Sequence, residues 1–226
     1  MKVKMLYLAM AMLIVAPFAA NALTITQNDT FSGETLDFSH TSTFNRFDTM
    51  GGTRVLNSVT FYLEFSVDSG GFIADNDAET TANISFEYAV NADLTSADVF
   101  GVTGTGVSIS DNVALELAAD DGDGSGVIDS NPSDGVIVNP STSTFMDSQV
   151  VNSSLHFSYI GTDTFDTILD SGRTFNITGS SGVEGGYTNM TGSGEITVVY
   201  DYSVVPEPAS LAILGLGGLL IRRRKK

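Results

Sequence analysis

One stretch of the sequence has residue types and a spacing that favour binding of a hard cation. Residues 120–129 read Asp-Asp-Gly-Asp-Gly-Ser-Gly-Val-Ile-Asp. Calcium-binding loops often place oxygen ligands at alternate positions around a glycine that allows a sharp turn. These ligand positions are filled here by Asp121, Asp123, Ser125, the carbonyl of Val127 and Asp129. The stretch is therefore a candidate calcium loop.

Two features separate this loop from an EF-hand. The twelfth position, where an EF-hand has a bidentate glutamate, is Pro132, and no amphipathic helices flank the loop. One alternative is a calcium site of another kind, closed by Asp134. The other is a solvated acidic loop without a bound ion. Extracellular calcium is near millimolar, so even a weak site of the first kind would fill.

The rest of the sequence offers little for catalysis. His40 and His156 are the only histidines, and there is no cysteine, no tryptophan and no Gly-x-Ser-x-Gly sequence. A Ser/His/Asp hydrolase site is therefore not supported. A second carboxylate group, Asp75, Asp77 and Glu79, is interpreted as a surface hairpin loop. We predict that the protein is not an enzyme and needs no cofactor apart from possible Ca²⁺ at the Asp-rich loop.

Charge is distributed unevenly along the chain. The formal net charge is −17, with 10 basic and 27 acidic residues. Only Arg46, Arg54 and Arg173 are basic between the two ends. A body this poor in cations is not expected to bind nucleic acid, which needs clustered Lys and Arg. The absence of cysteine excludes disulfides and thiolate metal sites.

The N-terminus has the three parts of a secretory signal peptide. Lys2 and Lys4 precede an apolar run, which ends in the small residues Ala20-Asn21-Ala22. We predict cleavage after Ala22, which makes residues 1–22 the signal peptide. The alternative is a retained membrane helix.

The C-terminus has a similar modular order. The triplet Pro206-Glu207-Pro208 precedes the uncharged residues 209–221, and five cations follow at 222–226. A helix over residues 209–221 would span roughly 20 Å, less than the ~30 Å hydrocarbon core of a bilayer. We therefore expect a short apolar helix that holds the inner membrane weakly, as a transmembrane helix with its basic end on the cytoplasmic side.

This arrangement resembles the PEP-CTERM sorting signal of exported proteins in exopolysaccharide-producing Gram-negative bacteria. The resemblance implies recognition by an exosortase, a membrane transpeptidase-like enzyme, and cleavage near Pro206, Glu207 and Pro208. Those residues would be the substrate site of this protein. An ordinary single-span tail anchor is the alternative.

Between the two ends, the dominant periodicity is that of β-strands. Apolar residues alternate at odd positions from Val59 to Val67, and the same period recurs around residues 84–90, 113–117, 155–159 and 196–204, with a shorter strand at Phe175 and Ile177. Clusters of Gly, Asn, Asp and Ser separate these runs. Residues 92–100 are predicted to form a helical turn. The pattern predicts an all-β fold, an antiparallel, jelly-roll-like β-sandwich.

The body also resembles a family of bacterial surface domains. The segments Phe31-Ser32-Gly33-Glu34-Thr35-Leu36-Asp37-Phe38-Ser39 and Leu56-Asn57-Ser58-Val59-Thr60-Phe61-Tyr62-Leu63 are similar to those of the choice-of-anchor group, type E. The resemblance implies an exported β-rich domain and brings no catalytic residues.

These observations predict a signal peptide at 1–22, an extracellular β-sandwich at 23–203 and a sorting signal at 204–226. The expected function is that of a structural or adhesive protein of the cell surface or extracellular matrix, exported across the inner membrane and processed by exosortase. Exopolysaccharide is an expected partner. A carbohydrate-binding module, calcium-dependent or not, is the alternative.

Overall fold

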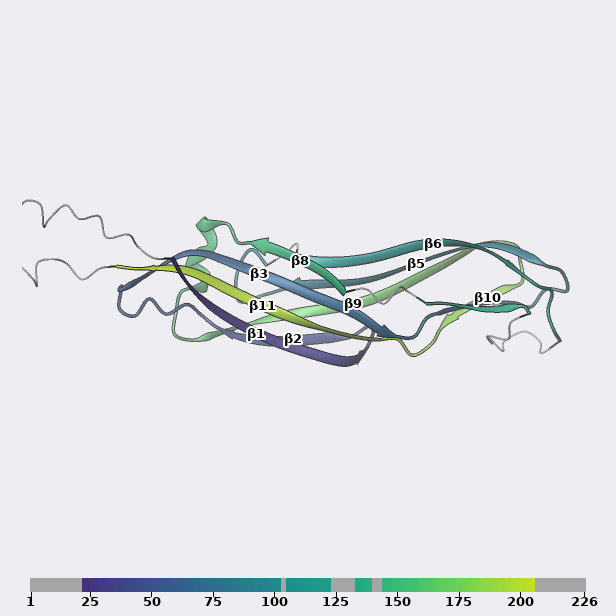
Figure 1. The fold of residues 1–226 in the computed structure, drawn as a ribbon, viewed down its shortest axis with the longest axis horizontal. Helices are drawn as coiled ribbons and strands as arrows, with labels where there is room; N and C mark the ends of the chain where they lie inside the picture. Colours follow the sequence, from purple (N-terminus) through teal and green to yellow (C-terminus); the bar gives the residue numbers. More distant parts are fainter. Residues whose placement is uncertain (1–21, 103–104, 123–132, 140–143, 206–226) are drawn as a thin grey trace, which may run out of the picture.

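The computed structural model describes residues 22–102, 105–122, 133–139 and 144–205, which form an elongated antiparallel β-sandwich (Figure 1). The predicted fold class is therefore confirmed. The predicted signal-peptide core and the C-terminal apolar helix lie outside the described residues. Within them, no helix combines the length and the hydropathy needed to cross a membrane.

The described residues form eleven strands and one short 3₁₀ helix. In chain order these are β1 (Ala22–Thr35), β2 (Ser39–Asn45), β3 (Arg54–Ser69), β4 (Phe72–Asn76), β5 (Ala82–Thr95), β6 (Thr105–Leu117), β7 (Gly135–Val138), β8 (Thr144–Val150), η1 (Ser153–Tyr159), β9 (Thr164–Gly179), β10 (Val183–Tyr187) and β11 (Thr191–Val204).

The sandwich has one continuous layer and one divided layer. The continuous layer is the sheet β2-β9-β5-β6, and the facing layer consists of the sheets β1-β11-β3-β8 and β10-β4-β7. All strand pairs in these sheets are antiparallel. Both chain ends of the described body lie at the β1-β11-β3 end of the rod, and β10-β4-β7 lies at the other (Figure 1).

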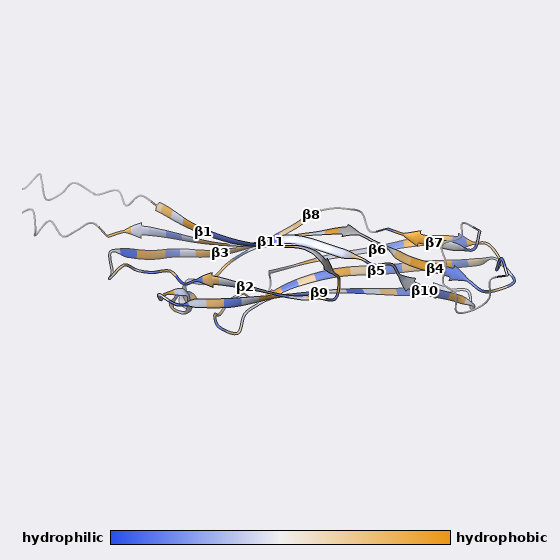
Figure 2. Ribbon diagram, turned by 90° about the horizontal axis from the view of Figure 1, so that it is seen from below, coloured by the Kyte–Doolittle hydropathy of each residue, from blue (hydrophilic) through white to orange (hydrophobic). Residues whose placement is uncertain are grey.

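The alternation of the sequence explains which face of each strand is buried. Val59, Phe61, Leu63, Phe65 and Val67 in β3 are all buried, as predicted. The predicted apolar positions of β5 and those of β11 up to Tyr202 are buried as well. Figure 2 shows the corresponding change of hydropathy along the strands. Burying one face of each strand against the other layer is what removes the apolar area from water.

Aromatic side chains join the two layers into one core. At the end near the chain termini, the ring of Phe61 in β3 lies 6.4 Å from that of Phe165 in β9. In the other half, Phe72 of β4 stacks on Tyr88 of β5 with ring centroids 4.9 Å apart. The core is therefore continuous along the rod, although the facing layer is divided into two sheets.

The divided layer changes from one sheet to the other where the β3–β4 connection and the β10–β11 connection approach each other closely. Gly70, between β3 and β4, has φ +89°, and a Cβ built there would lie 2.6 Å from the Cα of Met190, between β10 and β11. Only glycine fits both the backbone angle and the space at this crossing. Gly70 is therefore a structural requirement of the divided layer.

One predicted strand is a helix instead. Leu155, Phe157 and Tyr159 lie in η1, where Asn152 caps the N-terminus by accepting a hydrogen bond from the N–H of Ser154 at 3.0 Å. Tyr159 is buried while Phe157 is exposed, so the three residues do not share a face. His156 accordingly lies in this helix, with Nε2 3.3 Å from the carbonyl oxygen of Val151.

Two further predictions about strand extent were wrong. Residues 92–95 are the end of β5, where Ala92 and Leu94 continue the buried alternation, so there is no helical turn there. Phe175 and Ile177 belong to the long strand β9, not to a short one. Thr167 and Ser171 occupy buried positions of β9, and these polar residues hid the period of two in the sequence.

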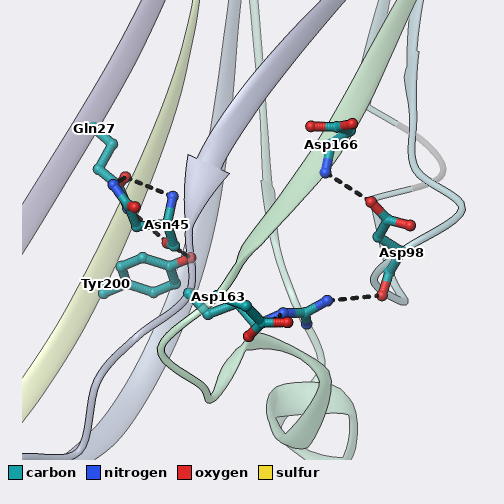
Figure 3. A network of polar contacts seen from close by, with 7 residues as sticks. Gln27, Asn45, Asp98, Asp163, Asp166 and Tyr200 are labelled. Atoms are coloured by element: carbon teal, nitrogen blue, oxygen red, sulfur yellow. Dashed lines mark hydrogen bonds and ion pairs between the residues drawn. The ribbon is translucent and has the colours of Figure 1, made fainter.

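A polar network links the two layers near the chain termini (Figure 3). The side-chain amide of Gln27 in β1 donates to the carbonyl oxygen of Asn45 in β2 at 2.8 Å and accepts from the N–H of Asn45 at 2.9 Å. The Tyr200 hydroxyl donates to the same carbonyl oxygen at 3.0 Å. The Gln27 side chain thus pairs with the β2 backbone as a neighbouring strand would.

Tyr159 provides a prediction about stability in this region. Its hydroxyl donates to the carbonyl oxygen of Phe100 at 2.7 Å, and the side chain is fully buried. In Tyr159→Phe this carbonyl loses its donor, so we expect the free energy of unfolding to fall by about 1–3 kcal/mol. Urea unfolding followed by circular dichroism measures it. The exposed Tyr62→Phe is the control, and an equal loss in both variants would contradict the assignment.

Candidate functional site

The end of the rod opposite the chain termini carries a cluster of acidic side chains, here called the acidic cluster. Its members come from just after β4, from the segments on either side of residues 123–132, and from β10. They are Asp77, Asp120, Asp121, Asp134 and Glu184.

The backbone around Asn76 brings these segments together. The side-chain amide of buried Asn76 donates to the carbonyl oxygen of Thr80 at 2.9 Å and to that of Ala118. The N–H of Asn76 donates to the carbonyl oxygen of Asp134 at 3.2 Å. Asn76 therefore ties the chain before and after residues 123–132 to the end of β4.

Three carboxylates of the cluster converge. One oxygen from each of Asp120, Asp121 and Asp134 lies within 4.8 Å of the other two. Asp134 is buried, and one of its oxygens accepts the N–H of Asp121 at 2.7 Å. Ca²⁺ is bound in proteins by oxygen ligands, and carboxylate oxygens are prominent among them. The three converging carboxylates are therefore suitable ligands for Ca²⁺.

The negative charges of the cluster act on Asp77. Burial raises the pKa of Asp77, and the neighbouring charges of Glu184, Asp120 and Asp134 raise it further. Like charges held close together disfavour ionisation of any one of them. The cluster therefore stores repulsion that a bound cation or a proton would relieve.

We expect Asp77→Asn to raise the thermal midpoint at pH 7. Because the folded pKa is raised, the folded chain binds a proton more tightly than the unfolded chain, so stability falls as the pH rises through the folded pKa. The gain should shrink as the pH falls through the folded pKa and vanish below about pH 3, where the carboxyl group is largely protonated in both states. Calorimetry of this variant beside Glu79→Gln, an exposed neighbour, measures the effect. An equal gain in both would contradict it.

The structure places part of the predicted calcium loop. Asp121 lies exposed in the cluster, and its N–H donates to a carboxylate oxygen of Asp134. Closure of a calcium site by Asp134 stays a prediction. Asp123, Ser125, Val127 and Asp129 lie outside the described residues, so the loop itself stays a prediction. Asp120, Asp77 and Glu184 were not among the predicted ligands.

The interpretation of the second carboxylate group as a surface hairpin loop was wrong for Asp75. This residue lies in β4 and is buried, while Glu79 is exposed. The sequence signal that could have indicated a strand here is the apolar run Phe72-Ile73-Ala74, which leads directly into Asp75. The Nε2 of His40, the other histidine, lies 3.0 Å from an Oδ of Asp29.

A second site is a polar groove of about 600 Å³ on the β9-β5-β6 sheet. Its lining is formed by three neighbouring positions on each strand: Glu87, Tyr88, Ala89, Ser110, Asp111, Asn112, Thr174, Phe175 and Asn176. Across the strands, Asn112 and Asn176 flank Glu87, and Ser110 and Thr174 flank Ala89. Asn112 donates to the Glu87 carboxylate at 3.1 Å and accepts from the Ser85 hydroxyl at 2.7 Å. Small and amide side chains thus surround the Glu87 carboxylate, and Asp111 adds a second carboxylate to the lining.

The comparison with protein families identifies the C-terminus. Residues 204–226 match the family model of the PEP-CTERM protein-sorting motif. The predicted sorting signal is therefore confirmed over the same residues. This motif implies export across the inner membrane, sorting by an exosortase, and location at the surface or outside the cell. Pro206, Glu207 and Pro208 fall within the motif but outside the described residues.

The remaining comparisons concern the whole chain. A search of curated proteins finds no match. Among solved structures, Desmodium yellow mottle tymovirus is similar at 9% identity, with 85% of this chain and 88% of that one covered and a TM-score of 0.21. Mud crab tombus-like virus is similar at 7% identity, with 88% and 89% covered and a TM-score of 0.25. The choice-of-anchor resemblance is not tested by any of these and stays a prediction.

Proposed function

We propose that this protein is a structural or adhesive component of the cell surface or extracellular matrix, delivered there by exosortase processing. The observation that carries the proposal is the position of the sorting motif. The motif begins at Val204, which is also the last residue of β11. The sorting signal is therefore joined directly to a central strand of the sandwich.

The body has features suited to a structural role. Long strands such as β3 and β9, of 16 residues each, extend along the rod and share one core (Figure 1). The outward faces of the β2-β9-β5-β6 sheet carry mainly Ser, Thr, Asn and acidic side chains. Such a surface stays soluble among anionic and neutral polymers. The role that we propose is one of shape and contact, without catalysis.

Processing is the step that an experiment can test first. Before it, we propose that residues 209–221 hold the chain transiently at the inner membrane. Exosortase then cuts near Pro206, Glu207 and Pro208. Mass spectrometry of the mature chain should show loss of Arg222–Lys226 in cells that have the exosortase, and retention in cells that lack it. A mature chain that keeps these residues in both would contradict the proposal.

The polar groove supports carbohydrate binding as a second candidate function. A groove of about 600 Å³ has the size of a small-ligand site. Its amide and hydroxyl side chains can donate to and accept from the hydroxyls of a neutral sugar. Titration calorimetry with exopolysaccharide fragments should show binding that Ala89→Trp abolishes by filling the groove. Thr60→Ala, on the other layer, is the control. Undiminished binding by Ala89→Trp would remove the groove from consideration.

Convergence of Asp120, Asp121 and Asp134 supports calcium at the acidic cluster. A bound Ca²⁺ would neutralise carboxylates that repel one another and would fix the two chain segments beside residues 123–132. The thermal midpoint should rise on addition of Ca²⁺ and fall back with chelator, and this response should be reduced in Asp120→Asn but kept in Glu79→Gln. An unchanged midpoint in calcium would contradict the site.

A further inference from the structure

Exposed apolar side chains gather at the end of the rod where the chain enters and leaves. Among the described residues, large apolar side chains that are exposed at this end are Leu23, Met50, Val55, Phe100, Phe157, Ile160, Val204 and Val205. We call six of them the terminal patch: Met50, Phe100, Phe157, Ile160, Val204 and Val205. Both views of the fold place η1 at the same end of the rod as the two chain ends (Figures 1 and 2).

The two phenylalanines of the patch are held outward by buried structure. Phe100 is 57% exposed and Phe157 is 64% exposed, and their ring centroids lie 6.0 Å apart. The N–H of Phe100 donates to the Ser158 hydroxyl at 3.3 Å, and its carbonyl accepts from the buried Tyr159. The backbone carbonyl oxygen of Tyr159 in turn accepts a hydrogen bond from the N–H of Phe47 at 2.7 Å. A fixed backbone therefore presents this aromatic pair to the outside.

The turn that carries Met50 connects the chain exit to this pair. The N–H of Val205 donates to the carbonyl oxygen of Thr53 at 2.8 Å, and the Thr53 hydroxyl donates to that of Met50 at 3.0 Å. On the other side of the same segment, Phe47 pairs with Ile160. Backbone contacts therefore link the segments that carry the patch, from the last described residue to Ile160 after η1.

The length of chain beyond Val205 limits how far this end can lie from the apolar tail. The uncharged run begins at Ala209, four residues after Val205. Four residues span at most about 14 Å when fully extended. If the tail is in the membrane, the patch is thus held close to the membrane surface.

The charges of the body favour the same orientation. Arg46 and Arg54, two of its three cations, lie near the chain ends, where Arg46 pairs with Asp163 at 3.2 Å and Arg54 lies over the Tyr202 ring. The acidic cluster lies at the far end of the rod. A membrane that contains anionic lipid therefore repels the end with the acidic cluster more strongly than the end with the chain termini.

We propose that, while the tail holds the chain at the inner membrane, the terminal patch docks on the outward-facing lipid surface and the rod stands with the acidic cluster directed away. This inference rests on the proposed membrane stage before processing. The partner is the phospholipid bilayer itself. Apolar and aromatic side chains enter the boundary between headgroups and acyl chains, as in other interfacial anchors.

The sequence contains no tryptophan, so a single introduced tryptophan reports its own position. Phe157→Trp places the probe in the patch, and Tyr187→Trp, half exposed in β10, places it at the far end. The chain purified from the exporting host, after signal-peptide removal and with its tail intact, is bound to vesicles of phosphatidylethanolamine and phosphatidylglycerol with brominated acyl chains. Bromine quenches tryptophan fluorescence only at short range.

We expect quenching by about half or more for the tryptophan at position 157, since interfacial side chains lie about 5–10 Å into the headgroup boundary, and none for that at position 187. Phe100→Ser in the Phe157→Trp chain should reduce the quenching, and Met146→Ser, on β8, should not. Chains that sediment with the vesicles but show equal quenching at both positions overturn the docking alone. Chains that do not sediment overturn both the docking and the membrane stage, so the two failures are distinguishable.

Discussion

Replacement of Pro206, Glu207 and Pro208 by alanine is expected to abolish C-terminal processing. These residues lie within residues 204–226, which match the sorting motif. The variant should accumulate in the membrane fraction with Arg222–Lys226 still attached, while the wild-type chain is found without them. Intact mass measurement and cell fractionation provide the two readouts.

The matched control for this variant is Glu79→Ala, which changes an exposed acidic residue of the body and leaves the motif untouched. It should be processed like the wild type. A triple variant with the wild-type mature mass would show that processing depends on the apolar and basic parts of the tail alone. Because β11 ends at Val204, neither set of changes is expected to alter the thermal midpoint of the body.

Phe72→Ala should produce the largest loss of stability. Phe72 is fully buried in β4, and its ring lies 4.9 Å from that of Tyr88 and 5.8 Å from that of Phe86. Truncation leaves a cavity between the β10-β4-β7 sheet and the continuous layer, so the free energy of unfolding should fall by about 3–5 kcal/mol. Equilibrium urea unfolding measures this loss.

Hydrogen exchange shows where the loss acts. Amides of β4, β7 and β10 should exchange faster in Phe72→Ala, while those at the centre of β11 keep their relative protection. Tyr187→Ala is the control, since its ring also contacts Phe175 but is half exposed, and its cost should be clearly smaller. A loss in Phe72→Ala no larger than that of the control would contradict the role of Phe72 in joining the layers.

The sequence predicted the strands in which apolar alternation is uninterrupted. In β3, every odd position from Val59 to Val67 is apolar, and all are buried. The signal failed where buried positions are polar or the strand is short. Thr167 and Ser171 are buried in β9, so its first half was not recognised, and β4, β7 and β10 are too short to show a period.

The 3₁₀ helix shows a different reason for failure. Leu155, Phe157 and Tyr159 alternate as strand residues do, yet the cap at Asn152 starts a helix in which only Tyr159 is buried. A stretch of seven residues cannot distinguish the two periods by apolar residues alone. Pairing partners decide the outcome, and these depend on residues far away in the chain.

The candidate site was predicted from one contiguous segment, and the structure extends it with residues from other strands. Asp121 and Asp134 were named from the sequence, and they are in contact. Asp77 and Glu184 join them because β4 pairs with β10, a pairing between residues more than 100 positions apart. No local pattern carries that information. The polar groove likewise combines β5, β6 and β9 and could not be read from any one of them.

The position of β11 within its sheet determines how the body bears mechanical load. β11 lies between β1 and β3 and is paired with both along most of its length. Hydrogen bonds in an antiparallel pair run perpendicular to the strands. A pulling force transmitted through the tail acts along β11. It therefore loads the hydrogen bonds on both sides of β11 in shear, so that they bear the force together. In unzipping, by contrast, the bonds would break one after another. Drag on a rod tethered in this way is shared by two ladders before any single bond must break.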